Sequence, residues 1–261
     1  MSGFLRIFRA EFRKFLTVRS SIIGITVNAA LTIGFGALIC AVMNQQYTSL
    51  SYQERLTFEP VIFSFAGILF GQFAAGVIGA QFITSEFATG AIHTTLAASP
   101  RRLTLFAAKA AVLKVVLLVV SAMSVIVSFV VGQALLNGPG VPRAHFSDPG
   151  VWRQIILTIL YLVLLGLTAL AIGFLLRQTA ATISVFVVVL LVLPIIDVLL
   201  PSSIRDATFK YLPSSLGRAM MSGETAYIYP VFSPWASAGI FVAYVVVLSA
   251  VSAYLFQRRD T

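Results

Sequence analysis

The sequence predicts an all-α membrane protein with six transmembrane helices, an N-terminal amphipathic interfacial helix, and outer re-entrant helices between spans five and six. Hydrophobic residues make up 59% of the chain, charged residues only 10%, and the mean hydropathy is +0.96. A soluble domain has about 25% charged residues. Six segments also reach the length of about 20 apolar residues that a bilayer core requires. The chain of 261 residues therefore predicts one membrane domain with short loops.

Residues 1–19 are predicted to form a basic amphipathic helix in the plane of the interface. At about 100° per residue, Phe4, Phe8, Phe12 and Phe15 form one stripe, and the arginines lie on the other side. One interpretation is a topology anchor. The other is a surface for a cytoplasmic partner, because Glu11 falls beside the stripe, where lipid alone offers the acid no favourable partner.

Residues 20–261 are predicted to form the six-span domain. The spans are about 21–43, 61–83, 107–136, 154–176, 180–200 and 234–256. An even number of spans places both termini on one side. With the termini inside, eleven basic residues flank the spans on that side, against six on the other. Because Lys and Arg favour the cytoplasmic side, we expect both termini in the cytoplasm.

The inner loop, residues 84–103, is expected to be held by a cytoplasmic partner. It carries an acid, a helix-permissive run, a proline stop and a basic cluster, whereas a loop that only turns the chain needs about two to eight residues. With two residues of the N-terminal helix, the candidate coupling residues are Glu86, Phe87, Gly90, Ile92, His93, Leu96, Arg101, Arg102, Glu11 and Lys14.

Small residues recur every four positions in the second span. Gly67, Gly71, Ala75 and Gly79 form a ridge that another helix can approach closely. The ridge serves either ordinary packing within the bundle or a dimer or gating interface.

Few polar residues within the spans are candidates for a pathway or gate. Lys114, Ser121 and Ser128 share one face of the third span, and Lys114 either snorkels to the inner interface or faces protein or water. Pro194 is expected to kink the fifth span. Asp197, one turn further on, is either an interfacial acid or part of an outward gate.

The outer segment, residues 201–233, is predicted to contain two short helices. Ser203 to Asp206 resembles a capping box for the first helix, Pro213 is expected to end it, and the second extends to Met221. Their large apolar residues predict helices that dip back into the membrane. The alternative is a surface loop lying on lipid.

Several classes of function are excluded by the sequence. No Gly-x-x-x-x-Gly-Lys-Ser/Thr motif occurs, so the chain is not expected to hydrolyse ATP itself. His93 and His145 lie on opposite sides of the membrane in this topology, so no metal site is expected. The basic residues lie at span ends, where they contact anionic membrane lipids, and this argues against a nucleic-acid partner. Cys40 has no second cysteine with which to form a disulfide within the chain.

Two motifs resemble those of ABC-2-type ABC transporter permeases, in particular actinobacterial ones. The inner loop contains Glu86-Phe87-x-x-Gly90-x-Ile92, then Thr95-Leu96, Pro100-x-Arg102 and Lys109. The N-terminal helix contains Ala10-Glu11-x-x-Lys14. Six spans, the outer helices and the basic C-terminal tail extend the resemblance over nearly the whole chain.

The resemblance implies a non-catalytic permease subunit in a bacterial cell membrane. A separate ABC ATPase subunit would bind ATP and Mg, and a second permease chain would complete a homodimer or heterodimer. Residues 87–99 would be a coupling helix seated in the ATPase, and the exported substrate would be a hydrophobic or amphipathic drug, peptide or lipid.

Two rival functions come from other classes. A six-span secondary carrier predicts inverted repeats and charged residues near the membrane midplane, and neither is evident in the sequence. A non-transporting membrane scaffold or sensor needs no polar coupling loop.

Overall fold

The computed structural model describes residues 3–98, 101–223 and 232–258, and all regular structure in these ranges is helical. Thirteen α-helices occur there: α1 (Gly3–Thr17), α2 (Arg19–Gln46), α3 (Tyr52–Leu56), α4 (Pro60–Ser64), α5 (Ile68–Ala88), α6 (Ala91–Ala98), α7 (Arg102–Leu135), α8 (Val151–Leu176), α9 (Thr179–Val187), α10 (Leu193–Val198), α11 (Ser202–Thr208), α12 (Pro213–Met221) and α13 (Pro234–Arg258). Two 3-10 helices, η1 (Tyr47–Ser49) and η3 (Phe209–Tyr211), and one π-helical turn, η2 (Val188–Val192), complete the order.

The prediction of six spans is confirmed by length and composition. Within the described residues, six helical segments are long and apolar enough to cross a membrane: Arg19–Ser49, Ile68–Ala88, Arg102–Leu135, Val151–Leu176, Thr179–Val198 and Pro234–Arg258. Each overlaps one predicted span. The chain therefore has the character of a multi-pass helical membrane protein.

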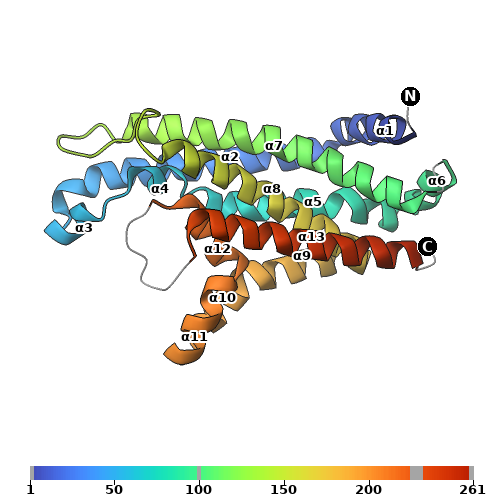
Figure 1. The fold of residues 1–261 in the computed structure, drawn as a ribbon. Coiled ribbons are helices and arrows are strands. Elements are labelled where there is room, and N and C mark those ends of the chain that lie inside the picture. Colours follow the sequence, from blue (N-terminus) through green and yellow to red (C-terminus); the bar gives the residue numbers. More distant parts are fainter. Residues whose placement is uncertain (1–2, 99–100, 224–231, 259–261) are drawn as a thin grey trace.

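The six long segments run along one elongated bundle, so the connections gather at its two ends (Figure 1). The N-terminal helix α1, the short helix α6 and the C-terminal end of α13 lie at one end, called here the α6 end. The helices α3 and α4, the connection from α7 to α8, and α12 lie toward the opposite end, called here the α12 end. The termini thus share one end of the bundle, as an even number of spans requires.

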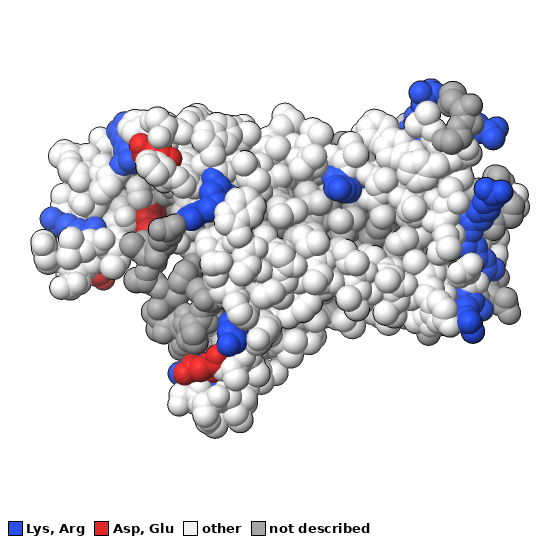
Figure 2. All heavy atoms as spheres, viewed as in Figure 1, with Lys and Arg blue, Asp and Glu red and all other residues white. Residues whose placement is uncertain are grey.

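Charged side chains are concentrated toward the two ends of the bundle. Figure 2 shows a long, mostly uncharged middle interrupted by one small basic patch. In this view the α6 end carries only basic side chains, and the acidic ones lie toward the α12 end. Large apolar side chains are exposed on the spans, for example Leu118 and Val119 on α7 and Val247 on α13, as lipid contact requires.

The small-residue ridge of the second span packs against two helices of its own chain. A Cβ added at Gly67 would lie 2.0 Å from the carbonyl oxygen of Thr32 on α2, and one at Gly79 would lie 2.1 Å from the carbonyl oxygen of Gly166 on α8. A Cβ added at Gly71 would lie 2.2 Å from the side-chain hydroxyl oxygen of Thr32, and Ala75 is fully buried next to Gly166. The glycines let the backbones approach closely, so the ridge is a packing surface within this bundle.

The second span is interrupted, which the predicted range 61–83 does not foresee. Helix α4 ends at Ser64 and α5 begins at Ile68. Between them the backbone forms hydrogen bonds between residues three apart, such as Ile68 N to Phe65 O at 2.9 Å. The hydroxyl of Ser128 donates to the Ser64 carbonyl at 2.6 Å. A side chain from α7 thus satisfies a carbonyl near the interruption, as a buried backbone group requires.

The fifth span bends as predicted, but through a π-helical turn. The turn η2 directly precedes Pro194 on α10. Proline has no backbone N–H, and its ring clashes with the carbonyl four residues earlier, so a wider turn accommodates it. Beyond this turn, α10 and α11 diverge from the bundle in Figure 1.

The outer segment contains two helices, but their boundaries differ from the prediction. Helix α11 begins at Ser202 after Pro201, and no side chain caps it, so Ser203 lies inside the helix. Pro213 occupies the first turn of α12 instead of ending its predecessor, a position where its missing N–H costs nothing. Helix α12 packs against α8 and α13. Residues 99–100 of the inner loop and 224–231 of the outer segment lie outside the described residues.

Candidate functional site

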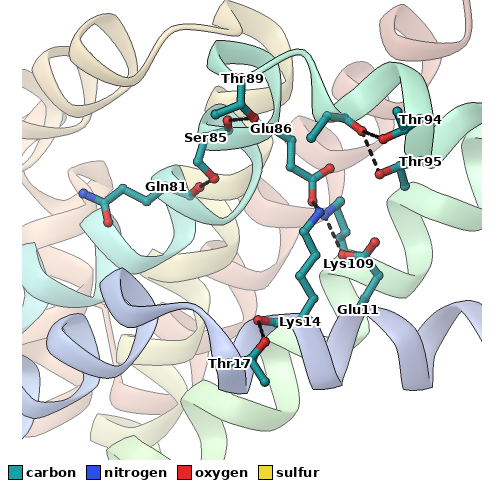
Figure 3. A network of polar contacts seen from close by, with 11 residues as sticks. Glu11, Lys14, Thr17, Gln81, Ser85, Glu86, Thr89, Thr94, Thr95 and Lys109 are labelled. Atoms are coloured by element: carbon teal, nitrogen blue, oxygen red, sulfur yellow. Dashed lines mark hydrogen bonds and ion pairs between the residues drawn. The ribbon is translucent and has the colours of Figure 1, made fainter.

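Four charged side chains form one cluster at the α6 end, called here the charge cluster: Glu11, Lys14, Glu86 and Lys109 (Figure 3). The Lys109 ammonium donates to Glu11 Oε2 at 2.6 Å and to Glu86 Oε1 at 2.6 Å. The Lys14 ammonium also donates to Glu86 Oε1. The cluster connects α1, α5 and α7, and its two acids balance its two bases.

Most of the charge cluster is withdrawn from solvent. Lys109 is 0% exposed, Glu86 3% and Glu11 4%, whereas the Lys14 side chain is 40% exposed. The Lys109 ammonium also lies 4.6 Å from the ring centroid of Phe82, a favourable cation–π arrangement. Ionised groups this deeply buried require paired charges, because desolvation costs several kcal/mol per ion. The four residues therefore act as one unit.

The sequence places these residues together through ordinary helical spacing. Glu11 and Lys14 are three residues apart and share one side of α1. Phe15 continues that side into the core, where its ring meets Phe82 edge-on at 5.0 Å. The aromatic stripe gives the Glu11 carboxylate no partner. That partner is Lys109 of the same chain. Contrary to the partner-surface interpretation, the Glu11 carboxylate faces inward.

Helix α6 has one face in the core and one face exposed. Gly90 has φ +71°, a left-handed conformation that ends α5, and a Cβ there would meet nothing within 4 Å. Ile92 is 2% exposed and packs in the core, with Leu96 partly buried beside it. His93 and Thr94 lie on the exposed face with Ala97. Within the chain, Gly90 is therefore required by its backbone conformation and not by packing.

The remaining predicted coupling residues differ in exposure. Phe87 is half-buried beneath the Arg177 guanidinium, 5.2 Å from its ring centroid. Arg102 donates to the carbonyl oxygen of Phe256 at 3.1 Å and is also half-buried. Arg101 is exposed. Of the predicted coupling residues, those open to a partner are therefore His93 on the outer face of α6, Arg101 and part of Lys14.

The predicted pathway residues do not form one lining. Lys114 is exposed on α7, whereas Ser121 and Ser128 are buried. Although the three share a helical face, α2 and α4 cover it at Ser128, whose hydroxyl lies near the carbonyls of Thr32 and Ser64. Asp197 is buried at 5% exposure and accepts a hydrogen bond from the Thr208 hydroxyl, so it connects α10 to α11.

A large apolar cleft lies toward the α12 end. Its volume is about 830 Å³, and its walls come from α2, α4, α5, α8, α10, α12 and the π-helical turn. Gln72 and Tyr161 line it and hydrogen-bond to each other at 2.7 Å. Ser214 and Arg218 contribute polar groups from α12. None of the predicted pathway residues lines this cleft.

Sequence reasoning missed two features of these sites. Lys109 belongs to the resembling motif, but its burial and its pairing with Glu11 depend on tertiary contacts that one sequence does not contain. Ser214 and Arg218 were detectable, because a spacing of four residues places them on one face of a helix.

No protein-family model matches the chain, and a search of curated proteins found no match to it.

Proposed function

We propose that this chain is the permease subunit of an ABC transporter of the ABC-2 type, which exports a hydrophobic or amphipathic substrate. A separate ATPase subunit binds ATP and Mg and docks on the α6 end, which faces the cytoplasm. A second permease chain completes the transporter. The chain itself is not catalytic.

The observation that carries the proposal is the two-sided construction of α6. Ile92 and Leu96 anchor one face in the core, while His93, Thr94 and Ala97 leave the other face open. A push on the open face is therefore transmitted to the spans and not absorbed by a flexible loop. The charge cluster extends this connection, because Glu86 on α5 pairs with Lys109 on α7 and, through it, with Glu11 on α1.

The rival functions account for this arrangement less well. A secondary carrier is expected to bury its ionisable groups near the membrane midplane. In the described part of the chain the buried charges lie in the charge cluster, at the α6 end, and at Asp197, one residue before the end of the fifth span. A scaffold or sensor gives no reason for an exposed helix fixed to the bundle core.

A purification experiment tests the proposal. The tagged chain is isolated from its native membrane in mild detergent, and ATP hydrolysis by the recovered complex is measured. Ala97→Glu places a charge on the open face of α6, where docking would bury it without a partner. A charge buried this way costs about 2–5 kcal/mol of binding, so the ATPase and its activity are expected to be lost.

Ala207→Glu is the matched control, because Ala207 is exposed on α11 far from the α6 end. The control is expected to retain the ATPase and its activity. Equal recovery for the two variants, or a wild-type preparation without a P-loop ATPase, would refute the proposed function.

A further inference from the structure

The apolar cleft at the α12 end has the size of a lipid-binding site and remains open on one side. Its volume of about 830 Å³ falls in the range of about 300–1,000 Å³ typical of ligand sites. Several wall residues are strongly exposed: Leu199 at 79%, Leu69 at 58% and Ile195 at 56%. In a bilayer these side chains face acyl chains, so a membrane molecule can enter laterally.

The shape of the cleft follows from the bend in the fifth span. The π-helical turn and Pro194 direct α10 away from the bundle, and Pro194 and Ile195 form part of the wall. The opposite wall comes from α4 and the first turns of α5, where the second span is interrupted. Two irregular spans thus leave a space that two straight helices would fill.

One side of the cleft offers groups that suit an anion. Ser214 and Arg218 are four residues apart on α12 and both line the cleft. The Ser214 hydroxyl oxygen is buried and has no hydrogen-bond partner among the described residues. Ser214 also lies in the first turn of α12, which no side chain caps and where the helix dipole favours negative charge.

Arg218 is placed to serve a ligand. Its guanidinium lies 5.3 Å from the ring centroid of Phe209, and the side chain is exposed. No carboxylate of the described residues pairs with it. The nearby acids have other contacts: Glu59 accepts from the backbone N–H of Gly223, Asp206 pairs with Arg205, and Asp197 accepts from Thr208.

We propose that this cleft binds an anionic amphiphile, with its phosphate group held by Arg218 and Ser214 and its acyl chain along the apolar wall. The guanidinium and hydroxyl supply charge-assisted hydrogen bonds to phosphate oxygens. The apolar volume far exceeds the needs of a free phosphate ion, so the ligand is a lipid. This inference rests on the proposed function, for which it specifies the substrate class.

Lipid titration of the purified chain tests the inference. The delipidated protein in nonionic detergent is titrated with phosphatidylglycerol and with diacylglycerol of identical acyl chains, which lacks the phosphate, and bound lipid is counted by native mass spectrometry. The wild type is expected to bind phosphatidylglycerol about tenfold more tightly, since one charge-assisted contact has that worth. Arg218→Ala is expected to abolish this preference, and Arg218→Lys to restore part of it.

Two further variants distinguish binding of the lipid headgroup from binding of the acyl chain. Ser214→Ala is expected to reduce the preference without weakening diacylglycerol binding. Ile195→Trp, which fills the apolar part from an exposed position, is expected to weaken both lipids. Lys210→Ala is the control, because Lys210 lies over Tyr211 and Phe232 and outside the cleft; it should behave as the wild type.

Three results would overturn the inference. If the preference for phosphatidylglycerol survives Arg218→Ala, the basic α6 end and not the cleft is its source. Competition by equimolar inorganic phosphate would indicate a site for the free ion. A lipid-free dimer would mean that a second copy of the chain covers the cleft. The titration uses no ATPase. A negative titration therefore does not contradict the proposed function, and loss of the proposed function does not contradict a positive titration.

Discussion

Lys109 is a fully buried cation whose ammonium contacts carboxylates from two other helices. Lys109→Met removes that cation and leaves Glu11 without its partner in a dry site. Breaking a buried ion pair from one side costs about 3–5 kcal/mol. We therefore expect a loss of this size in the free energy of unfolding, measured by denaturant titration of the detergent-purified chain.

Lys14→Met is the comparison for this prediction, because the Lys14 side chain is 40% exposed and Glu86 keeps Lys109 as a partner. Its cost is expected to stay within about 1 kcal/mol, as for exposed pairs. Replacing Lys109 with Met and both acids with Gln should recover much of the lost stability, because the one charge that remains, on Lys14, is partly exposed to solvent. Equal losses for the two single lysine variants would contradict a shared, buried cluster.

Gly79 in the middle of α5 and Gly90 just beyond its end serve different purposes, and substitution distinguishes them. Gly90→Ala is expected to cost about 1–2 kcal/mol through its left-handed backbone alone, since space is free around it. Gly90→Asn should cost less, because Asn tolerates this conformation. Gly79→Ala places a Cβ against the backbone of α8 and should cost about 1–3 kcal/mol.

The same unfolding measurement tests the glycine variants. The decisive comparison is Ala against Asn at residue 90. If Gly90→Asn is as destabilising as Gly90→Ala, packing and not backbone conformation determines the choice of glycine there.

At the scale of elements, the bend in the fifth span is expected to depend on Pro194. Pro194→Ala restores a backbone N–H and removes the ring clash, so a regular helical turn becomes available in place of η2. The end of α10 is then expected to move toward the second span and narrow the cleft. Spin labels at residues 69 and 199, placed in a chain lacking Cys40, should show a shorter distance by pulsed EPR.

Pro213→Ala is the control for this element. Pro213 lies in the first turn of α12, where a proline imposes no bend. The distance between the labels should stay at its wild-type value in this variant. If Pro194→Ala also leaves it unchanged, packing against the neighbouring helices produces the bend.

Elements with a strong sequence period were predicted well, and those with competing signals were not. The apolar runs gave six spans because lipid requires uninterrupted apolar length. The interruption at 65–67 was missed because Phe65, Ala66 and Gly67 are as apolar as a continuous helix. Pro213 was misplaced because proline both ends one helix and begins another, and only the packing of α12 distinguishes the two.

Prediction of the charge cluster failed for a different reason. The sequence identified Glu11 as an acid beside the aromatic stripe that needs a partner, and it placed Lys14 and Glu86 among the candidate coupling residues. It could not identify the partner of Glu11, because Glu11 and Lys109 are 98 residues apart along the chain. Only the packing of α1 against α7 brings them together.

At the scale of the whole molecule, the orientation in the membrane is testable. The α6 end is expected to face the cytoplasm, because basic residues dominate the inner segments. In a chain with Cys40→Ala, a membrane-impermeant maleimide applied outside should label His145→Cys and not Thr95→Cys. Labelling at residue 95 in intact cells would reverse the orientation.

The position of Lys109 also has a consequence for synthesis. Translation produces α1 first, and Glu11 has no buried cation to meet until the ribosome has added 98 more residues. Until then the acid keeps α1 in water or among headgroups, apart from the growing bundle. Docking of α1 therefore requires that synthesis has reached the first turns of the third span, α7. A nascent chain truncated before residue 109 should leave α1 open to protease, and so mark unfinished molecules for destruction.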